Sequence, residues 1–329
     1  METIDVTGNT VTGSGSTQIT INPSSNFDEI SSYYLVIDAT AFDDASGNSF
    51  GGISDKTTYN FTTVDNTNPS LSSSTPADNA TGVGRNANIF LTFSEAVDVE
   101  SGNITIKKTS DDSTFETIDV TGNKVTGTGT NEITINPSNT FASSTEYYVL
   151  IDATAFDDGA GNSYAGITDA TTLNFTSVDV VAPTLSSSTP SDNATGVAVD
   201  ANIVLTFSEA VDVESGNITI KKSSDNSTVE SIDVTSGLVT GSGTNQITIN
   251  PTNNLASLTG YYLNIDATAF DDNAGNSYAG ITNATTLNFT SADVVAPTLS
   301  SSTPSDNATG VAADANIVLL SLIHISEPT

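Results

Sequence analysis

Residues 203–222 read IVLTFSEAVDVESGNITIKK, and this stretch decides the fold class. Ile203, Leu205 and Phe207 alternate with Val, Thr and Ser, and the alternation returns at Ile218 and Ile220. A period of two over a short run is typical of a β-strand with one buried face, because successive side chains point to opposite sides of the strand. The stretch therefore predicts two strands joined by a polar turn.

The chain repeats itself at a fixed interval of 114 residues. Residues 89–108 match 203–222 except that Phe90 stands where Val204 does. The opening P-[ST]-L-S-S-S-T-P begins at Pro69, Pro183 and Pro297. The motif IDATAFDD recurs with the same interval, at Ile37, Ile151 and Ile265. Solenoid repeats have periods of roughly 20–50 residues, so a unit of this length is a whole domain.

The repeat predicts how the chain is divided. The two complete copies differ at about 25 of 114 positions, with no insertion or deletion. Residues at the start match only the later part of a repeat, and residues near the end match only its opening. The predicted divisions are an incomplete repeat at 1–68, complete repeats at 69–182 and 183–296, and the start of a fourth at 297–319.

The last ten residues, 320–329, have no counterpart in the repeat. Leu319 still matches Leu205, but Leu320 stands where Thr206 would be expected. The segment resembles translated adapter sequence, and a divergent natural C-terminus is the alternative. Because the single histidine of the chain, His324, lies here, we place no functional weight on it.

The pattern of strands predicts an all-β fold. Short alternating runs are separated by Gly, Asn, Asp, Ser and Thr, and no segment has helical periodicity. Positions expected to face inward, such as Ile89 and Leu91, recur unchanged, whereas the outward Phe90 does not. Some seven short strands in about 110 residues indicate tandem immunoglobulin-like Greek-key β-sandwich domains, arranged like beads on a string.

A tyrosine follows a large apolar residue by six positions in each copy. Tyr33, Tyr147 and Tyr261 occupy this place. The spacing fits a tyrosine corner, in which the hydroxyl bonds to upstream backbone. An ordinary core tyrosine is the alternative.

The composition restricts the classes of function. Seven Lys and Arg against 39 Asp and Glu give a formal net charge of −32, which disfavours nucleic acid and anionic lipid as partners. There is no Cys, so disulfides and thiolate metal sites are excluded. Without Cys or a dependable His, we find no catalytic constellation and expect no enzymatic activity. No apolar run is long enough to insert into a membrane, and we expect any export signal to lie outside this sequence.

Three motifs give the repeat a family resemblance. They are the P-x-L-x-x-x-x-P-x-D-x-A-x-G-V opening, the N-I-x-L-T-F-S-E-A-V-D strand and the D-D-x-A-G-N-S-Y-A-G loop. Residues 1–319 resemble the bacterial Ig-like domains of S-layer proteins and large surface adhesins. The resemblance implies an extracellular or cell-surface bacterial location, a role as a stalk or spacer, and often Ca²⁺.

Acidic residues recur at one end of each predicted sandwich. In this fold the B–C and F–G loops lie together at the pole where the chain enters, beside the incoming linker. Hard oxygen ligands from three segments suit Ca²⁺, which takes about six to eight of them. We expect Ca²⁺ at or near each domain junction; solvated turn residues are the alternative. The candidate ligands are Asp65, Glu95, Asp98, Glu100, Asp157, Asp158 and Asn162 in one copy, and Asp179, Glu209, Asp212, Glu214, Asp271, Asp272 and Asn276 in the next.

Two functions remain open from the sequence. The first is a structural extender whose partners are neighbouring repeats of the same chain. The second is an adhesive module that contacts a cell-surface glycan or protein through polar loops. Because the copies differ mainly at outward positions, we favour the extender.

Overall fold

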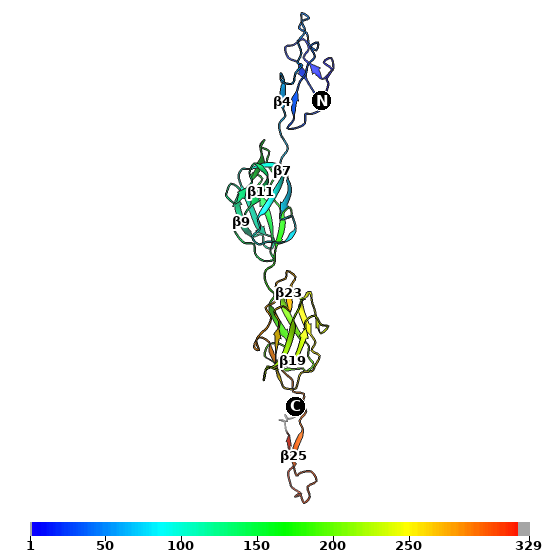
Figure 1. Ribbon diagram of the computed structural model, residues 1–329, viewed down its shortest axis with the longest axis vertical. Helices are drawn as coiled ribbons and strands as arrows, with labels where there is room; N and C mark the ends of the chain where they lie inside the picture. Colours follow the sequence, from blue (N-terminus) through cyan, green and yellow to red (C-terminus); the bar gives the residue numbers. More distant parts are fainter. Residues whose placement is uncertain (1, 322–329) are drawn as a thin grey trace. The chain divides into compact units, whose positions relative to one another are not determined.

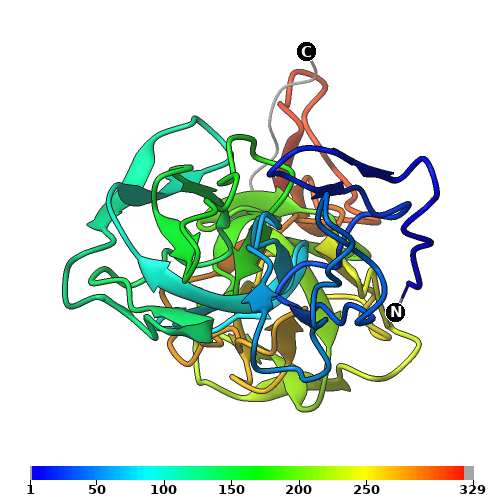
Figure 2. The ribbon, with the colours of Figure 1, turned by 90° about the horizontal axis from the view of Figure 1, so that it is seen from above.

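The computed structural model describes residues 2–321. The chain divides after Val178 into two compact units, which we describe separately. In residues 2–321, all regular secondary structure consists of β-strands (Figure 1). The view from above shows no helix either (Figure 2). The predicted all-β class is confirmed. Of the predicted non-native tail, residues 322–329, with His324, lie outside the described residues.

In the first unit, residues 69–178 form two five-stranded sheets. The first contains the long strand β7, which is labelled in Figure 1. Its members are β5 (Leu71–Thr75), β7 (Ile89–Val99), β10 (Val125–Thr126), β11 (Thr130–Ile135) and β13 (Phe156–Asp158). The strand β7 pairs with β5, β11 and β13. The second has the order β6-β14-β12-β8-β9. Its members are β6 (Ala80–Val83), β8 (Asn103–Lys108), β9 (Thr114–Asp119), β12 (Glu146–Ile151) and β14 (Asn174–Ser177).

The second unit repeats both sheets with equivalent pairing. The first sheet contains β15 (Leu185–Thr189), β17 (Ile203–Val213), β20 (Val239–Thr240), β21 (Thr244–Ile249) and β23 (Phe270–Asp272). The second contains β16 (Ala194–Val197), β18 (Asn217–Lys222), β19 (Thr228–Asp233), β22 (Gly260–Ile265) and β24 (Asn288–Ser291).

The two ends of the described chain form smaller sheets. Near the N-terminus, β1 (Val11–Thr12) pairs with β2 (Thr20–Ile21), and β3 (Ser32–Tyr34) pairs with β4 (Asn60–Thr62). These correspond, 114 residues earlier, to parts of β10, β11, β12 and β14. Near the C-terminus, β25 (Leu299–Thr303) pairs with β26 (Val318–Ser321), like β5 with β7.

The alternating side chains fill the core between the sheets. Ile203, Leu205 and Phe207 are at most 3% exposed, as are their equivalents in the other complete copy. The Phe207 ring lies 5.4 Å from that of Phe270 and 5.2 Å from that of Tyr278. Each complete domain therefore has its own hydrophobic core, which is what an independently folding unit needs.

The tyrosine corner is confirmed in all three copies. The hydroxyl of Tyr147 accepts a hydrogen bond from the backbone N–H of Ala142 at 2.8 Å. The same bond joins Ala256 to Tyr261 at 2.8 Å and Asp28 to Tyr33 at 2.8 Å. In the complete domains the ring is also buried, so each of these tyrosines packs in the core and holds the upstream loop through its hydroxyl.

Replacing Tyr261 with Phe is expected to lower the free energy of unfolding of its domain by about 1 kcal/mol, because the hydroxyl bond is lost while the ring stays. The urea midpoint of that domain measures the effect. An unchanged midpoint would show that the bond contributes nothing, and Tyr147→Phe repeats the test in the other domain.

Candidate metal centre

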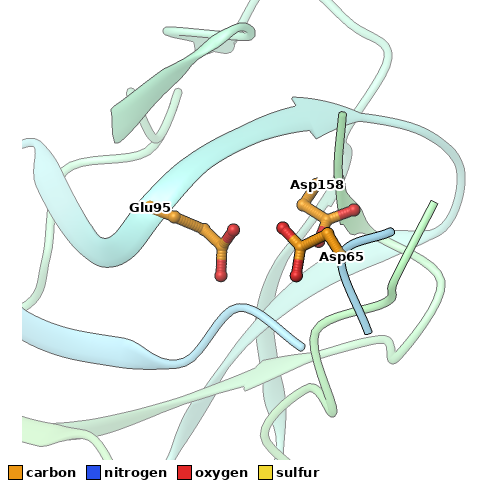
Figure 3. Close-up of side chains that lie close together, drawn as sticks. All are labelled: Asp65, Glu95 and Asp158. Carbon is orange, nitrogen blue, oxygen red and sulfur yellow. The ribbon is translucent and has the colours of Figure 1, made fainter. Parts of the chain in front are cut away.

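Each complete domain brings three carboxylates together. Asp65, Glu95 and Asp158 offer oxygens that all lie within 4.8 Å of one another, and Asp179, Glu209 and Asp272 do the same. Figure 3 shows Glu95 pointing from its strand toward the other two side chains. We call these two groups the carboxylate clusters. Each draws on the incoming linker, the long central strand and a short strand of the same sheet.

Asp158 is fixed by the turn that it starts. Its Oδ1 accepts the backbone N–H groups of Ala160 and Asn162, both at 2.8 Å. Its Oδ2 accepts the side-chain amide of Asn162 at 2.7 Å. The turn needs Gly161, whose φ of 90° disfavours any side chain. Asp158 is 5% exposed, as is Asp272, which makes the equivalent bonds.

Glu95 projects from an irregular part of β7. The ladder with β11 is regular from Ile89 to Thr92 and resumes only at Val97. From Val97 to Val99, β7 also pairs with β13. Interruptions of this kind redirect side chains. Here the break turns Glu95 toward the end of β13, and Glu209 lies in the same interruption of β17.

Asp65 comes from the linker that precedes the first strand. Its Oδ1 accepts the backbone N–H of Thr67 at 3.0 Å, and its carbonyl accepts the amide of Asn162 at 3.3 Å. In the second unit, Asp179 accepts the N–H of Val181 at 3.0 Å. Both aspartates therefore sit in a local turn that orients the carboxylate.

The electrostatics of the clusters oppose full ionisation of the glutamate. Burial raises the pKa of Glu95, and the negative charges of Asp65 and Asp158 raise it further. The pKa of Glu209 is raised by burial and then by Asp272 and Asp179. Asp158 differs, because burial raises its pKa but the hydrogen bonds from Asn162 and the turn outweigh this and lower it. A bound cation would relieve the repulsion among the three groups.

Removing the charge of Glu209 is expected to stabilise its domain at pH 7 when no divalent cation is present. A carboxyl whose pKa is raised by folding adds stability below its ordinary pKa of 4.5, and this is lost as the pH rises through the raised value. Glu209→Gln should therefore raise the urea midpoint in chelator at pH 7 and have little effect at pH 4. The gain should stay below about 1 kcal/mol, because the side chain is partly exposed. A lower midpoint at pH 7 would contradict this electrostatic account.

Several predicted ligands lie elsewhere. We expected the acidic residues of each copy in loops or in the linker, but β7 continues to Val99, so Glu95 and Asp98 lie in a strand. Asp157 is likewise in β13, directly opposite Asp98. Neither belongs to the cluster, nor does the exposed Glu100. In the second copy the residues outside the cluster are Asp212, Glu214 and Asp271.

The two asparagines predicted as ligands lie beside the carboxylate clusters. Asn162 and Asn276 donate to the cluster aspartates Asp158 and Asp272 and so hold them in place. Orienting partners of this kind are common behind metal ligands. The alternation rule missed the break in β7 because it assigns strands from inward positions alone, which stay regular up to Phe93.

In residues 2–64 the same turn is present without a carboxylate cluster. Asp44, equivalent to Asp158, accepts the N–H groups of Ser46 and Asn48 at 2.8 Å and the Asn48 amide at 2.9 Å. The turn thus forms in a segment that has no counterpart of Glu95. The Asp-x-x-x-Asn turn therefore forms without a cluster. A carboxylate cluster requires, in addition, the linker aspartate and the strand glutamate.

The donor set of each cluster fits a hard divalent cation. Three carboxylates supply up to six oxygens and three negative charges, and Ca²⁺ takes six to eight oxygens in flexible geometry. Asp65, Glu95 and Asp158 would hold the ion in the first unit, and Asp179, Glu209 and Asp272 in the second.

In residues 2–321, the structure has no helix with the length and hydrophobicity needed to cross a membrane. Comparison with curated proteins gives no match.

Comparison with solved structures gives matches to bacterial S-layer and biofilm associated proteins. The N-terminal part of the bacterial S-layer protein SbsC is 13% identical; the match covers 65% of this chain and 43% of that one, with a TM-score of 0.25. The S-layer protein rSbsC(31-844) is 11% identical over 72% of this chain and 42% of its own, with a TM-score of 0.25. The BSP domain of a biofilm associated protein is 13% identical over 66% and 29%, with a TM-score of 0.18. The chain thus spans less than half of each.

A family model described as a bacterial Ig-like domain matches residues 65–177 and 179–291. Each match begins at the linker aspartate of a carboxylate cluster, so the family unit includes all three acidic residues. Because the two matches cover more than half of its length, the chain belongs to the bacterial Ig-like domain family.

Proposed function

We propose that this chain is an extender segment of a bacterial cell-surface protein, in which tandem domains carry another part of the protein away from the surface. The observation that carries the proposal is the repetition of a whole domain. Both complete copies have the same sheet pairing and equivalent core positions, and each has a carboxylate cluster. A structural unit gains from such repetition, whereas a ligand site usually diverges between copies. The bacterial Ig-like domain family supports the surface location.

The second part of the proposal is that Ca²⁺ at each cluster fastens the linker to the domain that follows it. The ion would neutralise carboxylates from the linker, the central strand and β13 or β23. Since one of the three ligands is a linker residue, binding would order the linker as well as stabilise the domain.

The stretch of chain between the two units is short, which is why an ordered linker would affect their connection. The N–H of Val178 donates to the carbonyl of Val83 at 2.8 Å, so Val178 is held by the domain that precedes it. Asp179, the next residue in the chain, is a member of the second cluster. With a cation bound, consecutive residues would be anchored in consecutive domains, and no free residue would remain between them. Few rotatable bonds would then separate the domains, as an extender needs.

Small-angle X-ray scattering in the presence of Ca²⁺, extrapolated to zero protein concentration, tests the extender proposal. A compact globule of this length would have a radius of gyration of about 20 Å. We expect a clearly larger value, and a value near that of the globule would contradict the proposal.

The adhesive alternative has its own outcome. Binding of a chain with a single complete repeat to a glycan array or to cells would favour the module over the extender. We expect no such binding. The charge balance also leads us to expect no binding to DNA or to anionic vesicles at physiological salt.

A further inference from the structure

Each complete domain contains one parallel pair of strands. In the second unit, β16 and β24 lie side by side and run in the same direction, whereas every other ladder described for this domain is antiparallel. β16 directly follows the first strand of the domain, and β24 is the last strand before the next linker. β6 and β14 form the same parallel pair in the other complete domain. The parallel ladder therefore joins the beginning of the domain to its end.

A pull on the two linkers of a domain acts along this ladder. The incoming linker pulls, through β15, on the first end of β16, and the outgoing linker pulls on the last end of β24. Because the two strands are parallel, the pull is applied at opposite ends of the ladder and slides one strand past the other. The hydrogen bonds run between the strands, so sliding stretches all of them together instead of one after another. Unfolding under tension then requires several bonds to break at once.

A backbone hydrogen bond closes each end of the ladder. The N–H of Asn193 donates to the carbonyl of Asn288 at 2.7 Å. At the other end, the N–H of Ala292 donates to the carbonyl of Val197, also at 2.7 Å. The other complete domain has the equivalent bonds, both at 2.8 Å, from Asn79 to Asn174 and from Val178 to Val83.

Asp192 adds a side-chain connection at the start of the ladder. Its Oδ1 accepts the backbone N–H of Asn288 at 3.0 Å and the side-chain amide of the same residue at 2.9 Å. The two residues are 96 positions apart in the sequence, so these bonds tie the segment before β16 to the start of β24. In the other domain, Asp78 accepts the N–H of Asn174 at 3.1 Å. Sliding of the two strands must break these bonds as well.

The ladder is shielded from water. In β24, Phe289 is 2% exposed and Ser291 is 1% exposed. Their partners in β16, Ala194 and Val197, pack against the core of the domain. Water cannot readily replace a buried hydrogen bond as it breaks, which raises the free energy needed to break it.

The first strand is loaded along its length too. β15 pairs with β17 from Leu185, opposite Phe207, to Thr189, opposite Val204. The linker residue Asp179 lies by the carboxylate of Glu209, beyond Phe207, so the linker enters from the outer end of β15. β17 is held in its sheet by β21 and β23. Tension must therefore slide β15 along β17 before it reaches β16.

We propose that each complete domain is a load-bearing link that resists tension applied through its two linkers. The parallel ladder and the aspartate beside it hold the beginning and the end of the domain together until their bonds break as a group. An extender needs only length, so resistance to tension is a further property of the domain. It requires no cation and involves neither end of the chain.

Single-molecule pulling on the full chain, in chelator, measures this resistance. Because the chain has no Cys, cysteines introduced in pairs give unique attachment points, and we choose exposed positions for them. Ala182→Cys with Val295→Cys loads the second domain from its linkers. Ser191→Cys with Thr286→Cys instead pulls apart the adjacent ends of β16 and β24, so that the ladder opens one bond at a time. At the same constant force, we expect the domain to stay folded at least about ten times longer when it is pulled from its linkers.

Two aspartate variants, each pulled from the linkers, identify the ladder as the source of the resistance. Asp192→Ala removes the side-chain bonds between the two strands and should shorten the folded lifetime under force by about tenfold. Asp233→Ala is the matched control, because this exposed aspartate also accepts two hydrogen bonds, but both come from Thr235, at 2.9 and 2.8 Å, and join no distant strands. This variant should leave the lifetime nearly unchanged.

Equal lifetimes in the two pulling geometries would overturn the proposal. So would an equal effect of Asp192→Ala and Asp233→Ala, because resistance would then follow the number of hydrogen bonds and not their place in the ladder.

Discussion

Replacing Phe207 with Ala is expected to separate the unfolding of the two complete domains. The side chain is 2% exposed and contacts two other aromatic rings, and a truncation of this kind costs about 3–5 kcal/mol. For a domain of this size the midpoint should fall by more than about 10 °C. Calorimetry should then show an early transition from the second unit and an unshifted one from residues 65–178.

Two further variants make this result specific. Val204→Ala, at an outward and half-buried position of the same strand, should shift the midpoint by much less. Phe93→Ala should move the transition of the other domain instead. If Phe207→Ala moved both transitions equally, the domains would not be independent folding units, and the repeated-domain basis of the extender would be wrong.

Ca²⁺ is expected to raise the thermal midpoints of both complete domains. A ligand at about 100 times its dissociation constant stabilises the state that binds it by about 2.7 kcal/mol. In a domain of this size, this corresponds to a shift of roughly 10 °C. Calorimetry in Ca²⁺ and in chelator measures the difference.

Glu209→Gln is expected to change the stability of its domain in opposite directions in chelator and in Ca²⁺. In chelator the variant should be slightly more stable than the wild type, because three crowded carboxylates become two. In Ca²⁺ it should be less stable, because a ligand is lost. A purely structural role for Glu209 would predict the same sign in both.

The controls come from acidic residues outside the clusters. Glu214→Gln removes an exposed charge near the end of the same strand, and Asp44→Asn alters the equivalent turn where there is no cluster. Neither should change the response of the complete domains to Ca²⁺. Midpoints that are equal in Ca²⁺ and in chelator for the wild type would contradict the cation site.

Most of the fold could be predicted from the sequence because the repeat supplies its own comparison. Ile203, Leu205 and Phe207 alternate with positions that vary between copies, and burial tolerates little change in volume. The spacing of Tyr261 from Leu255 likewise anticipated a bond to backbone that the structure shows. These features depend on local periodicity, which a sequence expresses directly.

The membership of the clusters could be predicted only in part. Topology alone brings the linker and β13 to the same end of the sandwich, so Asp65 and Asp158 were within reach of a sequence argument. The selection of Glu95 over Asp98 depends on where the β7 ladder breaks, and this break is set by pairing with β11 and β13. Such long-range pairing leaves no local sign in the alternation of residues.

The order of the linkers on the picosecond to nanosecond timescale tests the central claim most directly. The linkers differ in sequence, Asn66-Thr67-Asn68 against Val180-Val181-Ala182, so their amide signals can be told apart despite the repeat. In Ca²⁺ we expect their ¹⁵N order parameters to match those of the strands, about 0.85, and in chelator to fall below about 0.6. Order parameters that are the same in both conditions would contradict the claim that a cation fastens each linker to its domain.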